Sequence, residues 1–231
     1  MIEVKNLVKK YGGIKVLDIP ELNIEKGASF GLVGNNGAGK TTFFSLILDL
    51  RRATGGHVYL KNQDTSLSDH WKAYTGSYID ENFLIDFLTA DEYFQFIASL
   101  HGLSKGDLQD FYQKYDELFA GEIVGRKKYI RELSKGNQKK VGIAAALLPK
   151  PELLVLDEPF SNLDPSSQIR LKNILKVLRK EDSVTMVISS HDLNHVTEVC
   201  ERIVILDNGI IVHDLQTSDK THEELESYFA V

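Results

Sequence analysis

An eight-residue glycine-rich stretch carries the strongest chemical signal in the sequence. It reads GNNGAGKT from Gly34 to Thr41 and follows a short apolar run. Glycines let successive backbone N–H groups turn toward an anion, and a helix beginning near Lys40 adds its positive end. The lysine suits the outer phosphates of a nucleotide, and the Thr41 hydroxyl suits Mg²⁺. The residues expected to line this site are Asn35, Asn36, Gly37, Ala38, Gly39, Lys40, Thr41 and Thr42.

Two adjacent carboxylates end a second apolar stretch, LLVLDE at 153–158. A buried strand that ends at Asp157 would place that carboxylate where it can hold the shell of a magnesium ion. Glu158 could orient and deprotonate a water molecule. Alone, the pair would be an ordinary acidic strand end, but behind a phosphate-binding loop it predicts hydrolysis of the bound nucleotide.

Strand patterns and helix patterns alternate along the chain and would position these residues. Residues 2–8 and 14–24 alternate apolar and polar, as half-buried strands do. The apolar runs SFGLVG, ELLVLDE and SVTMVISSH are typical of buried parallel strands, and amphipathic segments separate them. Asn208-Gly209 predicts the turn of a closing hairpin. Together they predict an α/β fold with a mainly parallel sheet and an N-terminal antiparallel β region.

Residues 80–142 differ from the rest and read as an inserted helical subdomain, with the core at 1–79 and 143–231 of a single domain. Two segments there have helical periodicity, and Thr89 and Asp107 are the expected caps. An aromatic set is expected in the core of this part, although some members could line a groove for a partner helix. That set is Trp71, Phe83, Phe87, Tyr93, Phe94 and Phe96.

Composition limits the class of protein. The 231 residues are 42% hydrophobic, enough for a sizeable core, and the net charge of -6 argues against a broad nucleic-acid footprint. The single cysteine, Cys200, excludes an internal disulfide and favours a reducing compartment. The N-terminus does not resemble a signal peptide, and the apolar run 141–148 is too short to span a bilayer. We therefore expect a soluble chain whose membrane role, if any, comes through a partner.

A further segment gives the chain a family resemblance. LSKGNQ, at 133–138, resembles the signature motif of ABC-type ATPases, usually written LSGGQ; Ser134 lies 157 − 134 = 23 residues before Asp157. With the phosphate loop, LLVLDEPFSNLDP and ISSHD, the chain resembles an ABC transporter ATP-binding subunit over essentially its whole length. The resemblance implies a P-loop NTPase core, ATP and Mg²⁺ as cofactors, and head-to-tail pairing with a second ATP-binding subunit, either identical or related.

The resemblance also assigns roles to residues. Tyr11 matches the position that stacks on adenine, although it could be a surface tyrosine in a hairpin. His191 matches the histidine that contacts the γ-phosphate, and residues 161–164 match the loop that crosses to the other subunit. The residues expected at the γ-phosphate of the opposite subunit are Ser134, Gly136 and Asn137.

Three positions depart from the family pattern, and one of them is Asn137, where the family commonly has glutamine. Asp80 stands where the family often has glutamine; its carboxylate could coordinate Mg²⁺ or a water, or belong to a loop remote from the metal. Lys135 replaces a common glycine, and it either adds charge near the phosphates or points to solvent. Signatures with Ser-Lys-Gly resemble those of bacterial exporters whose membrane subunit is a separate chain.

The resemblance implies an ATP-hydrolysing subunit on the cytoplasmic face of the cell membrane, powering a separate transmembrane permease subunit, most simply for export. The main alternative is a soluble ABC-type ATPase that acts on DNA or ribosomes; such relatives usually carry coiled coils or two ATPase halves, which this sequence lacks. A GTPase is disfavoured because there is no N-K-x-D motif. The histidines at 57, 70, 101, 195 and 213 show no metal-ligand spacing.

Overall fold

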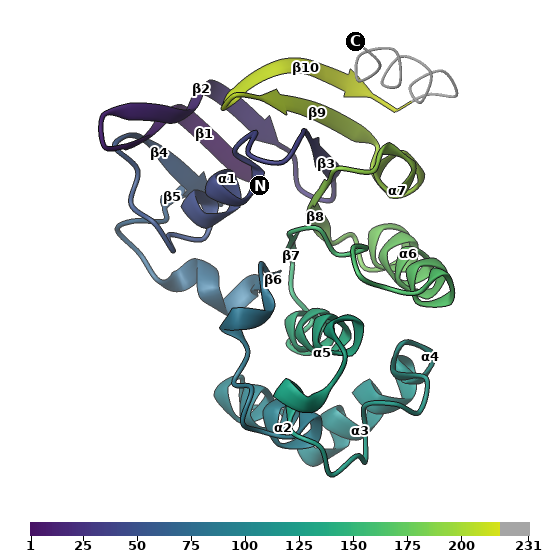
Figure 1. The fold of residues 1–231 in the computed structure, drawn as a ribbon. Coiled ribbons are helices and arrows are strands. Elements are labelled where there is room, and N and C mark those ends of the chain that lie inside the picture. Colours follow the sequence, from purple (N-terminus) through teal and green to yellow (C-terminus); the bar gives the residue numbers. More distant parts are fainter. Residues whose placement is uncertain (218–231) are drawn as a thin grey trace.

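Two β-sheets and a set of helices make up residues 1–217, the part of the chain that the computed structural model describes (Figure 1). The smaller sheet is antiparallel, in the order β2-β1-β4-β5. Its strands are β1 Ile2–Tyr11, β2 Ile14–Ile24, β4 Gly55–Leu60 and β5 Gln63–Asp64. The N-terminal antiparallel region expected from the alternating pattern is confirmed.

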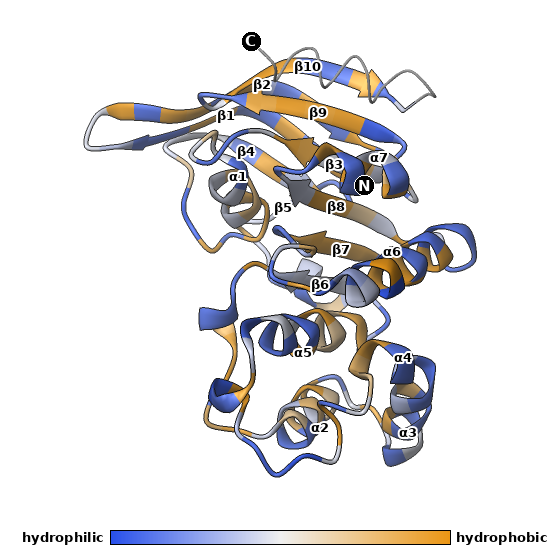
Figure 2. Cartoon of the chain, turned by 45° about the vertical axis from the view of Figure 1, so that its right-hand side comes forward, coloured by the Kyte–Doolittle hydropathy of each residue, from blue (hydrophilic) through white to orange (hydrophobic). Residues whose placement is uncertain are grey.

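The larger sheet has the order β10-β9-β3-β8-β7-β6, and all neighbours except β10 and β9 are parallel. Its strands are β3 Ser29–Val33, β6 Thr75–Tyr78, β7 Leu153–Leu156, β8 Thr185–Ser190, β9 Arg202–Asp207 and β10 Ile210–Gln216. Strands β3, β7 and β8 are buried along their whole length because the sheet is covered on both faces. Figure 2 shows these strands largely in the hydrophobic colour, which is typical of strands that are covered on both faces.

The helices surround the larger sheet and extend below it in Figure 1. The α-helices are α1 Lys40–Ile47, α2 Ala90–Leu100, α3 Lys105–Lys114, α4 Asp116–Phe119, α5 Lys135–Leu147, α6 Pro165–Lys180 and α7 Leu193–Val199. Short 3₁₀ turns are η1 His70–Tyr74, η2 Glu81–Phe83 and η3 Ile130–Glu132. Within residues 1–217 no helix combines the length and the apolar character needed to cross a membrane.

Helix α5 joins the helical part to the sheet, since it packs against both β6 and α2. It runs unbroken from Lys135 to Leu147, so the division expected at residue 142 falls inside a helix. The residue limits of the two parts therefore remain a prediction. Thr89 caps α2 as expected, but the expected cap of α3 was wrong. Ser104 is the N-cap there, and Asp107 completes the capping box three residues later.

The aromatic residues divide between core and surface differently from the expectation. Trp71 is buried in a second apolar core, which is separate from that of the helical part and also contains residues of the antiparallel sheet and α1. Its indole N–H donates to the Thr65 carbonyl oxygen at 3.3 Å. Tyr93 and Phe94 are buried in the helical part as expected. Phe83, Phe87 and Phe96 are instead 62%, 61% and 40% exposed. These three side chains are therefore available at the surface rather than part of a core.

Candidate active site

The glycine-rich loop connects β3 to α1 and is shaped by backbone conformations that favour glycine. Gly37 has φ 86° and Gly39, the N-cap of α1, has φ 109°. A Cβ on Gly34 would lie 2.2 Å from the backbone oxygen of Leu206 in β9, so a side chain cannot fit there. Asn35, Asn36 and Gly37 are exposed, Ala38 is buried, and Thr42 is half-buried. The loop is thus held tightly against the sheet while its tip remains open.

Lys40 is the first residue of α1 and is 6% exposed. Its ammonium donates to the carbonyl oxygens of Gly34 at 2.6 Å and Asn35 at 3.3 Å. The first-turn N–H groups of a helix have no intrahelical partners, and the glycine N-cap brings no side chain to accept from them. A buried lysine, free N–H groups and the positive helix end converge here, which is the set of donors that a phosphate chain requires.

Asp157 follows the last residue of β7 and is 4% exposed. The hydroxyl of Ser189 in β8 donates to one carboxylate oxygen, and the hydroxyl of Thr41 donates to the other. Burial raises the pKa of this carboxyl, while the two hydroxyl groups act in the opposite direction. Mg²⁺ prefers oxygen ligands and usually takes one or two carboxylates plus substrate phosphates. The adjacent oxygens of Thr41 and Asp157 fit that requirement.

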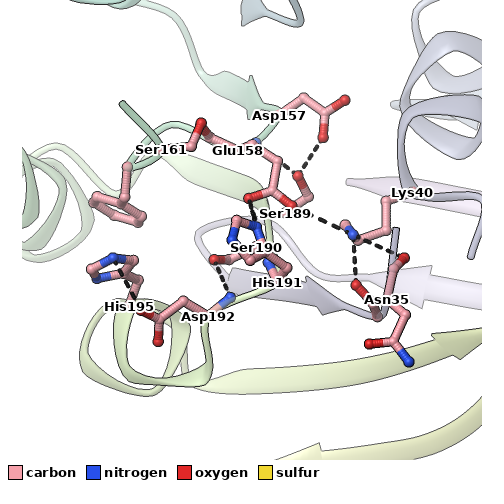
Figure 3. A network of polar contacts seen from close by, with 12 residues as sticks. Asn35, Lys40, Asp157, Glu158, Ser161, Ser189, Ser190, His191, Asp192 and His195 are labelled. Atoms are coloured by element: carbon pink, nitrogen blue, oxygen red, sulfur yellow. Dashed lines mark hydrogen bonds and ion pairs between the residues drawn. The ribbon is translucent and has the colours of Figure 1, made fainter. Parts of the chain in front are cut away.

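Glu158 turns its side chain toward Lys40 and His191 (Figure 3). Its φ of 46° is left-handed, which is uncommon for a residue with a side chain. One carboxylate oxygen lies 3.4 Å from the Lys40 ammonium, and the other lies 2.8 Å from Nδ1 of His191. The Glu158 N–H donates to the Ser189 hydroxyl at 2.8 Å. A carboxylate held between two nitrogen groups beside a phosphate loop is well placed to take a proton from water.

Two of the expected ligand residues lie outside this network. Tyr11 ends β1 and is 39% exposed; Arg51 donates to its hydroxyl at 2.7 Å, and the Lys9 ammonium lies 4.9 Å from its ring centroid. Asp80 follows β6 and accepts hydrogen bonds from the backbone and side chain of Asn82, so its carboxylate caps η2. Stacking on adenine by Tyr11 and metal binding by Asp80 both remain predictions.

The signature residues form the start of α5. Ser134 is exposed and caps the helix by accepting from the Asn137 N–H at 3.2 Å. The Asn137 amide donates to Glu122 at 3.1 Å, and the Lys135 ammonium lies 2.7 Å from a Glu81 oxygen. A Cβ on Gly136 would lie 2.7 Å from the backbone oxygen of Asn162. These residues therefore contact the helical part and the 161–164 loop of their own chain.

Sequence reasoning missed two polar residues of the network. Ser189 bridges Asp157 and the Glu158 N–H, and Lys139 donates to the Glu158 carbonyl oxygen at 2.7 Å. Ser189 could have been found, because it lies one residue before the end of β8, the strand beside β7, and precedes His191 by two residues. Lys139 gave no such signal, since its contact depends on how α5 crosses the sheet.

The fold and the site together define a P-loop ATPase, and comparison with known proteins identifies its family. Residues 17–161 match the family model described as ABC transporter. An uncharacterised ABC transporter ATP-binding protein, YhaQ of Bacillus subtilis, is 37% identical over 209 residues, covering 90% of this chain and 69% of that one. The chain belongs to the ABC transporter family, and it is an ATP-binding subunit of that family.

Two further relatives carry functional names. The bacitracin transport ATP-binding protein BcrA of Enterococcus faecalis is 34% identical, with 95% of this chain and 70% of that one covered. The methionine import ATP-binding protein MetN of Carboxydothermus hydrogenoformans is 32% identical, with 95% and 67% covered. Relatives named for transport and for import thus both occur, so the family does not fix the direction of transport.

The fold expected from the sequence is confirmed by solved structures. The dimeric post-hydrolysis state of the ATP-binding cassette MJ0796, bound to ADP and Pi, superposes with a TM-score of 0.83 at 28% identity. The match covers 94% of this chain and 99% of that one. The chain therefore has the fold of an ABC ATPase cassette.

Proposed function

We propose that the chain binds Mg-ATP, hydrolyses it while paired with a second ATP-binding subunit, and thereby drives a separate transmembrane subunit that exports its cargo. The observation that carries the proposal is the convergence of Lys40, Asp157, Glu158 and His191 at the end of β3, β7 and β8. These groups supply a cation for the phosphates, oxygen ligands for a metal ion and a proton acceptor within one site.

Each residue of the site has a separate task. Lys40 and the loop residues Asn35, Asn36, Gly37, Ala38, Gly39, Thr41 and Thr42 surround the phosphates. Thr41 and Asp157 would hold Mg²⁺, which when bound offsets phosphate charge. Glu158 accepts a proton from the attacking water while the water oxygen bonds to the terminal phosphorus. The bond between that phosphorus and the bridging oxygen breaks, and ADP leaves. Nδ1 of His191 lies 2.8 Å from the Glu158 carboxylate, and His191 would contact the γ-phosphate.

Pairing of two subunits completes the site in this proposal. At the start of α5, Ser134, Gly136 and Asn137 would contact the γ-phosphate of the ATP bound by the partner subunit. Tyr11 would stack on adenine. The first turn of α5 consists of Lys135, Gly136 and Asn137, so its positive end meets no carboxylate of its own turn. The similar cassette MJ0796 is described as a dimer, which supports this arrangement.

A groove between β6, α2 and α5 is the proposed docking site of the transmembrane subunit. Its volume is about 210 Å³, and its lining includes Tyr78, Phe83, Leu84 and Ile97. Phe83 is 62% exposed on η2, whose cap is Asp80. The occupant we propose is an apolar segment of the transmembrane subunit, because the chain belongs to a transporter family and carries this apolar groove beside the site. Asp80 would then connect docking to the metal region.

The proposed direction of transport is export, and it rests on the Ser134-Lys135-Gly136 signature, which resembles that of bacterial exporters. The name of the bacitracin transport relative is compatible with export, whereas the methionine import relative is named for the opposite direction. Inside-out membrane vesicles that accumulate bacitracin with ATP would support export. Vesicles of the opposite orientation that take up methionine when loaded with ATP would contradict it.

The experiment that tests the docking proposal measures ATP hydrolysis with and without the proposed transmembrane subunit, reconstituted in liposomes. Phe83→Ala should reduce the stimulated rate about tenfold while leaving the basal rate unchanged, because losing one or two buried contacts costs about 1–2 kcal/mol. Asp80→Ala should reduce the stimulated rate more than the basal rate. Phe96→Ala is the control, since Phe96 is 40% exposed on α2 outside the groove. Equal effects on both rates would refute the docking site.

A further inference from the structure

Lys139 is a buried cation that none of the tasks above uses. It lies in α5, five residues after Ser134, and is 4% exposed. Its ammonium donates to the Glu158 carbonyl oxygen at 2.7 Å and to the Ser161 hydroxyl, and it lies 5.8 Å from the ring centroid of Tyr78. A lysine is seldom buried to this degree unless its charge is paired or hydrogen-bonded.

Lys139 holds the backbone of a residue with a left-handed conformation, Glu158. Glu158 has φ 46°, and a left-handed residue with a side chain persists only where its surroundings hold it. Its carbonyl oxygen accepts from the Lys139 ammonium, from the Ser161 hydroxyl at 2.9 Å and from the Ser161 N–H at 3.3 Å. Of these donors the ammonium gives the strongest bond, because it is charged. The backbone conformation of Glu158 in turn directs its carboxylate toward Lys40 and His191.

The surroundings of Lys139 explain why a cation is held there. Burial lowers the pKa of Lys139, while the carboxylates of Glu81, Glu158, Asp157 and Asp80 act to raise it. These acids follow the ends of β6 and β7, so Lys139 places a buried cation between the two strand ends. The ammonium thus offsets negative charge beside the catalytic carboxylate without contacting the phosphate loop.

We propose that Lys139 is a positioning residue for ATP hydrolysis, whose ammonium fixes the Glu158 carbonyl and so keeps the Glu158 carboxylate facing the phosphate site. The inference rests on the proposed role of Glu158 as proton acceptor. Because the same helix begins at the signature residue Ser134, α5 contributes to its own chain's site as well as presenting the signature.

The consequence of removing the ammonium follows from these contacts. Lys139→Met keeps the length and apolar stem of the side chain but removes the ammonium, which donates to the Glu158 carbonyl oxygen and to the Ser161 hydroxyl. The Glu158 peptide can then relax from its left-handed conformation, which moves the carboxylate. A misplacement of about 1 Å at a catalytic group costs about 100-fold in rate, so kcat should fall by about that factor. ATP affinity should stay within about twofold, because the contacts of Lys139 are to Glu158, Ser161 and Tyr78.

The experiment compares kcat, KM and calorimetric ATP affinity of the full chain and three variants, with thermal unfolding to check the fold. Lys139→Arg should recover most of the kcat that Lys139→Met loses, since a guanidinium can donate to the same carbonyl. Lys140→Met is the matched control. Lys140 is equally buried on α5, but its ammonium lies 3.9 Å from Glu122 and 3.8 Å from Asp164 rather than at Glu158. It should leave kcat within about twofold of wild type.

A folded Lys139→Met chain with wild-type kcat would overturn the inference, and so would equal losses of kcat in Lys139→Met and Lys140→Met. If Lys139→Met does not fold, Ser161→Ala makes the test in milder form, because it removes the other side-chain donor to the same carbonyl. A lower kcat with unchanged ATP affinity then supports the inference, and an unchanged kcat overturns it. Glu158→Gln separates the two proposals: if that variant hydrolyses ATP normally, the proposed function fails, whatever Lys139 does.

Discussion

The tetrapeptide Leu-Ser-Lys-Gly occurs twice, at 103–106 and 133–136, and begins a helix in both places. At α3, Ser104 is the N-cap and Asp107 closes a capping box, accepting from the Ser104 N–H at 2.9 Å. At α5, Ser134 is the N-cap, but the fourth residue after the leucine is Asn137, whose amide donates to Glu122. Identical residues thus give two different helix ends.

The difference lies in charge and in packing. Asp107 places a carboxylate in the first turn of α3, where it offsets the positive end of that helix. The first turn of α5 contains no acidic residue to offset its positive end. Gly136 lies so near the Asn162 carbonyl oxygen that a Cβ there would be only 2.7 Å from it. The neighbouring residues, rather than the tetrapeptide itself, therefore make the second copy suitable for a phosphate. Matched substitutions at the two copies can test this reading.

The largest difference should come from replacing the two serines with arginine and measuring ATP hydrolysis at high protein concentration. Either change removes an N-cap and costs about 1 kcal/mol of stability. Only Ser134→Arg should block the γ-phosphate of a partner subunit, lowering kcat by about 10²–10³-fold, as loss of a donor to a developing anion does. Ser104→Arg should keep nearly the wild-type rate. Similar rates for the two variants would remove the functional distinction between the helix ends.

A smaller difference should appear in stability when the two glycines become alanine. A Cβ on Gly136 would lie 2.7 Å from a backbone oxygen, and such overpacking costs about 1–3 kcal/mol. The same Cβ on Gly106 would lie 3.5 Å from the Ser104 hydroxyl, an ordinary contact, so the better helix propensity of alanine should stabilise α3 by about 0.5–1 kcal/mol. Thermal unfolding should therefore shift in opposite directions, and a shared direction would contradict the packing described for α5.

Much of the site could be predicted because its residues are close in sequence to recognisable local patterns. The phosphate loop and the adjacent pair Asp157 and Glu158 each follow an apolar strand, and parallel strands bring such ends to one edge of the sheet. The Asn208-Gly209 turn was also predictable, and its φ values of 46° and 81° fit a two-residue hairpin.

The remainder depended on packing between distant segments. Ser189 reaches Asp157 from 32 residues away, and Lys139 reaches Glu158 from 19 residues away. Trp71 was assigned to the wrong core because a buried aromatic shows no local sign of which sheet covers it. Phe83 and Phe87 were expected in a core on hydrophobicity alone, whereas their exposure depends on the course of the chain around η2. Hydrophobicity indicates that a residue is able to be buried, but not which surface will cover it.

The most direct measurement is the mass of the Glu158→Gln chain in solution with and without Mg-ATP. Loss of the proton acceptor should slow hydrolysis by about 10²–10⁴-fold while ATP remains bound, and bound ATP favours the associated state by mass action. We expect a dimer in ATP and a monomer without it; adding Ser134→Arg should abolish the dimer while leaving ATP affinity intact, and adding Ser104→Arg should preserve the dimer. A dimer that survives Ser134→Arg, or is lost equally with Ser104→Arg, would contradict closure of the α5 signature over the partner's nucleotide.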